Sequence, residues 1–199
     1  MLVYYAERLN GVELNGSFYR TPPPPALAAW AAAVPAGFRF CFKAHRGLTY
    51  SGPAFDREGL AAEVGRRFRQ LGERLGPVLL QFPPTRSVDP AGLHAILSAL
   101  GIRAAVELRD PSWFREDVYG VLREHGAALV VTDQEKWPLA PRLELSGFGY
   151  YRLRRDYGEE ELEHWRRELQ AERGTREELH AYFRHDVRSP AWAARLLEP

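Results

Sequence analysis

Short apolar stretches alternate with longer stretches of helical spacing along the chain. Runs of apolar or alternating residues predict strands, and apolar residues three and four positions apart predict helices. A predicted helix lies between most of the predicted strands, and this order favours parallel strands joined by right-handed crossovers. The predicted strands cover residues 11–15, 38–43, 77–82, 103–108, 128–133, 150–154 and 179–184.

Prolines, glycines and capping residues mark the ends of the predicted helices. The last of these helices begins at Ser189, a suitable N-cap, with Pro190 as its first helical residue. The predicted helices cover residues 24–34, 56–76, 89–101, 115–126, 158–174 and 189–198.

Two α/β architectures fit this order, a doubly wound open sheet and a (β/α) barrel. The first is less favoured because no glycine-rich phosphate-binding fingerprint follows the first strand. The sequence therefore predicts one TIM-barrel-like domain over residues 1–199, with seven parallel strands.

Polar side chains gather toward the carboxyl ends of the predicted strands, and most share one parity with residues that face away from the helices. In the strand 38–43, Lys43 is in phase with Cys41, while the phenylalanines point the other way. Barrel active sites form at these strand ends. The polar residues there are Glu13, Asn15, Ser17, Lys43, Gln81, Glu107, Arg109, Asp133, Arg152 and Arg154.

This mixture of charges suits a small anionic or sugar-like ligand, because buried ions are costly and contribute little to stability by themselves. We expect Glu13 or Glu107 to act as general acid or base and Lys43 as electrophile or proton donor. Arg109 and Arg152 would hold the anion, with the amides and hydroxyls nearby. Asp133 would orient one of the cations. The plainer alternative is that each carboxylate only pairs with an arginine.

Aromatic residues on or just past the strand ends are candidates for stacking on a sugar or a base, although core packing is the commoner fate of tryptophan. For Trp113, the alternative is that it shapes and covers the loop after its strand. The aromatic candidates are Tyr19, Trp113, Trp137 and Tyr182.

Composition limits the classes of partner. Lysine and arginine (27) nearly balance aspartate and glutamate (26), which disfavours nucleic acid or an anionic membrane as a partner of the whole protein. The single cysteine, Cys41, excludes an intramolecular disulfide framework and is expected in the core. The chain has no membrane-spanning run and no signal peptide, so we expect a cytoplasmic protein. No cofactor is required, and Mg²⁺ or Mn²⁺ on His185 with two carboxylates is the weaker alternative.

Seven motifs follow one another along the sequence: VELNGSFYRTP, FRFCFKAHRGLTYSG, LGPVLLQFPP, AVELRDPSWF, LVVTD, YYRLR and AYFRHD. Together they resemble the YecE-like proteins, the family of domain of unknown function 72. The resemblance implies a TIM-barrel-like fold without an established reaction. The resemblance also implies further polar positions in the site, and among these Tyr182 and Asp186 belong to the last motif.

Two motifs depart from the family pattern. The usual YFNND reads Tyr182-Phe183-Arg184-His185-Asp186, and Leu153-Arg154 replaces a His-Gly pair after Arg152. The family also begins with an additional strand, which this sequence lacks. Three explanations are open: strands 11–15 and 179–184 pair directly, a second copy covers the exposed edge, or the true start lies upstream.

Three functions are therefore open. The first is an enzyme that acts on a small phosphorylated or otherwise anionic, sugar-like molecule by hydrolysis, lyase chemistry or isomerisation. The second is a protein that binds or processes nucleic acid, with arginines on the phosphates and aromatics on the bases. The third is a ligand-binding barrel without catalysis.

Overall fold

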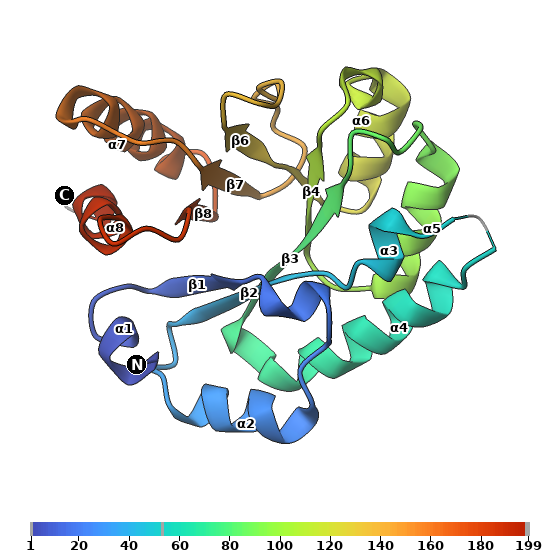
Figure 1. Cartoon of the computed structure of the whole chain (residues 1–199), viewed down its shortest axis with the longest axis horizontal. Helices are drawn as coiled ribbons and strands as arrows, with labels where there is room; N and C mark the ends of the chain where they lie inside the picture. The colour runs from blue at the N-terminus through green and yellow to red at the C-terminus, as the bar shows by residue number, and fades with distance from the viewer. Residues whose placement is uncertain (1, 53, 198–199) are drawn as a thin grey trace.

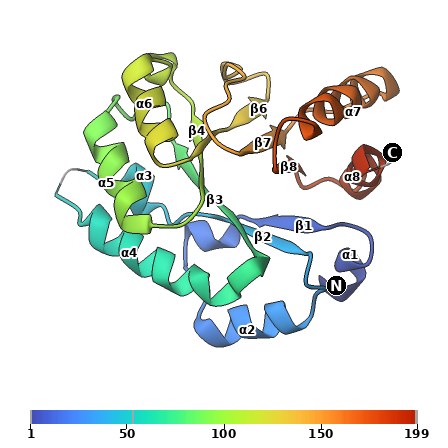
Figure 2. The same cartoon turned by 180° about the vertical axis from the view of Figure 1, so that it is seen from behind.

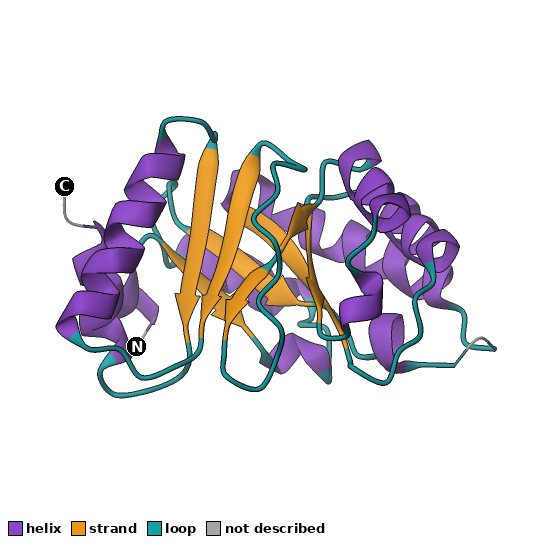
Figure 3. Cartoon of the chain, turned by 90° about the horizontal axis from the view of Figure 1, so that it is seen from above, coloured by secondary structure: helices purple, strands orange, loops and turns teal. Residues whose placement is uncertain are grey.

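Parallel strands in two sheets form the centre of the molecule, and helices cover their outer faces (Figures 1 and 3). The structure is a computed structural model that describes residues 2–52 and 54–197. The five-stranded sheet has the order β1-β2-β3-β4-β5 and the three-stranded sheet the order β6-β7-β8. The strands are β1 Gly11–Leu14, β2 Arg39–Lys43, β3 Leu75–Phe82, β4 Ala104–Leu108, β5 Ala128–Leu129, β6 Val131–Asp133, β7 Phe148–Leu153 and β8 Glu178–Phe183.

Helices follow most strands, as the sequence predicts, and α2, α4, α5 and α6 run along the outside of the five-stranded sheet (Figures 1 and 2). None of the described helices has the length and apolar character needed to cross a membrane. The α-helices are α1 Leu2–Ala6, α2 Pro24–Ala32, α3 Gly47–Tyr50, α4 Arg57–Phe68, α5 Pro90–Leu100, α6 Glu116–Glu124, α7 Glu159–Arg173 and α8 Ser189–Leu197. The 3-10 helices are η1 Gly16–Phe18, η2 Arg69–Arg74 and η3 Pro111–Trp113.

Most predicted elements agree with the structure to within two residues at each end, and two differ more. The helix predicted over 56–76 ends at Phe68, because the short η2 follows and Gly72 has a positive φ of 56° that breaks the helical path. The strand predicted over 128–133 is divided at Val130, so that β5 pairs with β4 and β6 pairs with β7. The prediction for residue 198 lies outside the described residues.

Side-chain parity separates an inner core from two outer ones. The outer cores lie between the strands and the helices, where Phe40 and Phe42 pack against α2 and α4, and Tyr151 and Leu153 pack against α7. The described members of the inner core are strand residues except Val130, which joins β5 to β6, so the strands themselves enclose this core. Its buried members are Cys41, Leu79, Ala105, Ala128, Val130, Phe148 and Tyr150, with Tyr182 packed against them.

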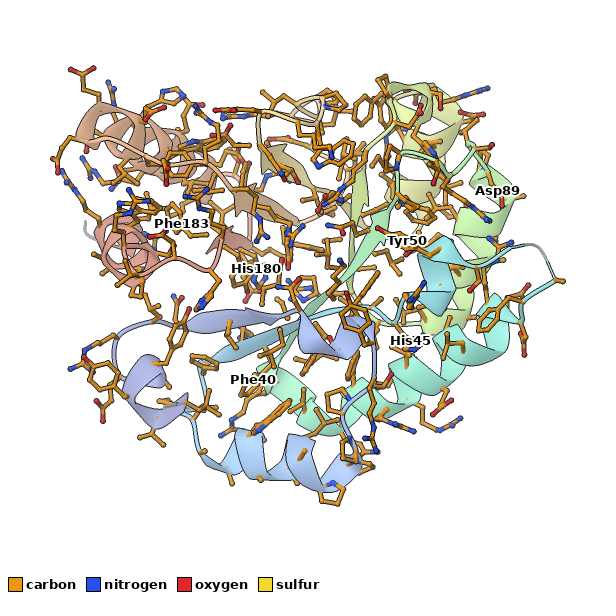
Figure 4. All side chains as sticks on the ribbon, viewed as in Figure 1. Phe40, His45, Tyr50, Asp89, His180 and Phe183 are labelled. Atoms are coloured by element: carbon orange, nitrogen blue, oxygen red, sulfur yellow. The ribbon has the colours of Figure 1, made fainter. Side chains whose placement is uncertain are left out.

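The first and last strands do not pair through their backbones. No ladder joins β1 to β8 in the described ranges, so the explanation that these strands close the sheet directly is wrong. Instead, side chains connect the two sheets: Tyr182 donates to Cys41 at 3.1 Å, and Arg39 pairs with Glu178 at 3.1 Å. A groove of about 1,010 Å³ lies along both edges. Figure 4 shows His180 of β8 on the side that faces β1.

Candidate functional site

A polar layer lies above the inner apolar core, at the carboxyl ends of the strands. Its side chains point to the same side of the strands as those of the inner core, and they lie two residues further along the strand. Gln81 lies beside Glu107 in the register of β3 and β4, and Lys43 follows Cys41 by two positions in β2. The layer consists of Glu13, Lys43, Gln81, Glu107 and Arg152, and we call it the polar cluster.

The guanidinium of Arg152 is the centre of the polar cluster. Its Nε and Nη2 donate to the two oxygens of Glu13 at 3.0 and 2.8 Å, and its Nη1 donates to Glu107 at 2.5 Å. The side chains of Arg152, Glu13 and Glu107 are only 2, 4 and 2% exposed. Two buried carboxylates therefore share one buried arginine, and this arrangement ties β1 and β4 to β7.

Both carboxylates are fully engaged by donors. Glu107 also accepts hydrogen bonds from Gln81 at 2.9 Å and Arg109 at 2.7 Å. Burial alone would raise the pKa of Glu107, but the charges of Arg152 and Arg109 outweigh it and hold the pKa below its ordinary value. Glu13 further accepts from Tyr150 at 2.9 Å and from Asn15 at 3.1 Å. Glu107 is thus an anion that anchors arginines.

Lys43 differs from the other members of the polar cluster. Its Nζ lies 3.8 Å from the centre of the Phe18 ring, and no described carboxylate forms an ion pair with it. Partial burial, followed by the charges of Arg152 and Arg109, lowers the pKa of Lys43 to about 8. An amine with this pKa can donate or accept a proton near neutral pH.

A pocket of about 480 Å³ opens beside Lys43, within the roughly 300–1,000 Å³ usual for small-molecule sites. Five of its ten lining residues are lysine or arginine, and no carboxylate belongs to the described lining. This pocket therefore presents positive charge, while the carboxylates of Glu13 and Glu107 lie outside its described lining. The lining residues are Asn15, Phe18, Tyr19, Lys43, Arg46, Tyr50, Gln81, Arg109, Arg152 and Arg154.

The structure does not bring Asp133 to this pocket. Its carboxylate accepts two hydrogen bonds from Arg155, at 2.7 and 3.0 Å, and one each from Tyr157 and Trp165. Thr132, not Asp133, lies beside Arg152 in the register. Asp133 has the opposite parity and faces α7, so its expected role of orienting a cation in the site is not supported.

Trp113 and Ser17 also lie outside the pocket, because both serve the local structure. Trp113 is fully buried, its indole N–H donates to the carbonyl of Arg86 at 2.8 Å, and its ring packs on Phe82. It therefore has a structural role rather than a stacking one, and its hydrogen bond holds the segment after β3, not the loop after its own strand. The Ser17 hydroxyl is 2.8 and 2.7 Å from the carbonyls of Leu14 and Lys43 and joins the ends of β1 and β2.

Tyr182 and Asp186 lie along the groove between β1 and β8 and not in the pocket. The hydroxyl of Tyr182 donates a hydrogen bond to the sulfur of Cys41, and burial raises the pKa of Tyr182 well above its ordinary value. The carboxylate of Asp186 is paired with Arg188 at 3.0 Å. His185 is exposed, and it does not belong to any group of described residues whose ligand atoms converge.

Sequence reasoning missed three parts of the site. Arg46 and Tyr50 come from the segment around α3, after β2, where no strand-end pattern marks them (Figure 4 labels Tyr50). Tyr150 shares the parity of Arg152 and could have been included by that signal alone. Arg154 was noted at its strand end, and it lines the pocket, where burial and the charge of Arg152 lower its pKa.

Comparison with known proteins identifies the family. The sequence model described as "Protein of unknown function DUF72" matches residues 1–199. The chain belongs to the DUF72 family. This agrees with the resemblance to YecE-like proteins, which are the same family. No curated protein matches this DUF72 chain.

Solved structures of DUF72 proteins share the fold. A DUF72 family protein (EF0366) of Enterococcus faecalis V583 is 21% identical, with a TM-score of 0.85 over 99% of this chain and 91% of its own. A DUF72 family protein (TM1631) of Thermotoga maritima MSB8 is 25% identical, with a TM-score of 0.76 over 94% of this chain and 82% of its own. These similarities support the α/β fold and carry no activity.

Proposed function

We propose that this DUF72 protein is an enzyme that binds a small anionic molecule, phosphorylated or sugar-like in class, and transforms it by acid/base chemistry. The observation that carries the proposal is the composition of the pocket, in which five cationic side chains and no described carboxylate form the lining. Hydrolysis, lyase chemistry and isomerisation all fit this description.

Lys43 is the proposed proton donor or electrophile. Its pKa of about 8 lets it hold a proton at neutral pH and release it to a leaving group or enolate oxygen. Arg109 and Arg152 are the proposed anion-binding groups. Arg109 has one donor committed to Glu107, which leaves the rest of its guanidinium fork for the ligand.

Glu13 and Glu107 receive a different proposed role from the one expected from sequence. Each oxygen of these carboxylates already accepts at least one hydrogen bond, and Glu107 has a lowered pKa. We therefore assign them to positioning Arg152, and assign the proton transfer to Lys43.

The framework of the site is, in this proposal, an incomplete (β/α) barrel. The chain passes from one sheet to the other at Val130, whose N–H still donates to the carbonyl of Val106 at 2.9 Å. If β5 and β6 count as one stave, seven parallel staves surround the inner core. The polar cluster then occupies the mouth where barrel enzymes carry their chemistry.

Inorganic phosphate, followed by a panel of sugar phosphates and sugar acids, tests the proposal. We expect phosphate to raise the thermal midpoint of the wild type, and Lys43→Met and Arg109→Met to remove this shift. Arg123→Met is the matched control, because Arg123 lies on the surface of α6 and its ion-pair partner among the described residues is Glu116. An equal phosphate shift in all four proteins would contradict the proposal.

Turnover separates the enzyme from the other two functions. An active compound from the panel should be transformed by the wild type and not by Lys43→Met. Stabilisation without turnover of any compound would favour a ligand-binding barrel. Tyr19 is 71% exposed beside the cationic pocket, which suits base stacking, so oligonucleotide binding with a steep salt dependence would instead favour nucleic-acid recognition.

The edge between β1 and β8 is the proposed surface for self-association. Strand edges with unpaired backbone groups tend to recruit another chain, and here the two edges border one groove. Light scattering across a concentration series tests this, and a monomer at every concentration would exclude it.

A further inference from the structure

Two histidines and a glutamate converge at the outer surface, away from the pocket. His94 belongs to α5, Glu124 is the last residue of α6, and His125 follows it. Nδ1 of His94 lies 3.2 Å from Nε2 of His125 and 3.5 Å from a carboxylate oxygen of Glu124. All three atoms lie within 4.8 Å of one another. None of these residues lines the pocket.

Few protons are available for hydrogen bonds among these three ligand atoms. One ring N–H at most fits between the two imidazole nitrogens, and the carboxylate of Glu124 approaches the same Nδ1 of His94. The neighbouring turn holds this arrangement, since Gly126 has a φ of 56° and its N–H donates to the carbonyl of Arg123. A cation at the centre would satisfy all three ligand atoms at once.

Two of the three separations between the ligand atoms fit a tetrahedral ion. Zinc binds imidazole nitrogen at about 2.0–2.1 Å and carboxylate oxygen at about 2.0–2.2 Å, which places neighbouring ligand atoms about 3.3–3.5 Å apart. The two observed separations from Nδ1 of His94, 3.2 and 3.5 Å, match this edge length. The third separation, between His125 and Glu124, is within 4.8 Å, and the exposed side chain of Glu124 can rotate to shorten it when an ion binds. Two imidazoles with one carboxylate are also a usual ligand set for zinc among the divalent metals.

We infer that His94, Glu124 and His125 form a zinc site that links α5 to α6, with water as the fourth ligand. The side chains of His94 and Glu124 are 45 and 60% exposed, so water reaches the fourth position. The site joins two neighbouring helices of the outer layer, where an ion that binds only the folded chain stabilises it. It is independent of the proposed enzyme activity.

Calorimetric titration of the metal-free full chain with zinc chloride tests this inference. We expect one ion per chain, and an affinity at least about tenfold lower in His94→Ala and His125→Ala, because loss of even an outer partner of a metal ligand costs about 10–100-fold. His164→Ala is the matched control, since His164 is exposed on α7 and outside the cluster. Equal affinity in the wild type and both cluster variants, or no binding to the wild type, would overturn the inference.

Cobalt substitution supplies a second readout that does not depend on stability. Co²⁺ in a tetrahedral site of nitrogen and oxygen ligands gives strong visible absorption, which octahedral, water-rich Co²⁺ lacks. We expect this absorption in the wild type and in His164→Ala, and its loss in His94→Ala. Weak octahedral bands in the wild type would refute the tetrahedral site. Far-UV circular dichroism verifies that each variant is folded, and the phosphate assay should be unaffected.

Discussion

Removal of the Arg152 guanidinium is the sharpest test of the polar cluster. Arg152→Met keeps a side chain of similar length in the same buried position, but removes the three donors that reach Glu13 and Glu107. Glu107 retains Arg109 and Gln81 as partners, whereas Glu13 retains the neutral donors Tyr150 and Asn15 and no cation among the described residues. The variant therefore leaves the buried carboxylate of Glu13, on β1, without a cationic partner.

The expected loss of stability is large for a single substitution. Breaking a buried ion pair from one side costs about 3–5 kcal/mol. For a chain of 150–250 residues, about 2–4 °C of thermal midpoint corresponds to 1 kcal/mol, so the midpoint should fall by about 6–20 °C. The loss should shrink on acidification to pH 4, because the pKa of Glu107 is lowered in the folded wild type and the stability that this carboxylate contributes through Arg152 decreases as the pH falls from the unfolded toward the folded pKa.

Guanidinium unfolding followed by tryptophan fluorescence at pH 7.5 and pH 4 measures the loss. Arg123→Met is the control, because its pair with Glu116 has side chains 47 and 77% exposed and should contribute no more than about 1 kcal/mol. Adding Glu13→Gln to Arg152→Met should restore part of the stability. Equal losses for Arg152→Met and Arg123→Met at pH 7.5 would refute the reasoning.

Three further predictions concern single positions. Lys43→Met should stabilise the protein at pH 7 by about 1 kcal/mol, after allowance for its exposed part, because burial disfavours the charged amine. Since the amine loses its proton near pH 8 when folded and near 10.5 when unfolded, this benefit should vanish between those values in urea titrations, and a benefit that grows with pH would contradict it. Trp113→Phe should lower the free energy of unfolding by about 1–3 kcal/mol, because the carbonyl of Arg86 loses its hydrogen-bond donor, and it should leave phosphate binding intact. Weaker phosphate binding in a stable variant would place Trp113 in the site. Asp133→Asn should cost about 1–3 kcal/mol through Arg155 without changing turnover of any active compound, and loss of turnover at unchanged stability would restore Asp133 as a site residue.

Much of the fold was predictable from local patterns. The bounds of β1, β2 and β4 differ from prediction by one residue at most, because alternation and apolar runs are properties of neighbouring residues. Cys41 is buried in the inner core as expected. The division of the strand 128–133 was not predictable, since all of its residues except the last are apolar or small and both faces look buried in sequence.

The sequence predicted which residues belong to the candidate site, but not which of them pair with each other. Parity placed Lys43, Gln81, Glu107 and Arg152 on one face, and the structure brings them together. Parity failed for Asp133, because the residue nearest the strand end is not always the one that faces inward. The sequence did not indicate the contact between His94 and His125, because they are 31 positions apart and meet through helix packing.

The sequence by itself determined which side chains share a face of each strand, because the period of two acts over neighbouring residues and needs no knowledge of the rest of the chain. The tertiary structure decided which charges meet. Arg152 binds Glu13 across 139 positions and Glu107 across 45, so the carboxylates position this arginine, while Lys43 lies beside the pocket without a described ion pair. The tertiary structure also decided that β1 and β8 do not pair. They lie in different sheets, and side chains rather than backbone groups connect the two sheets there.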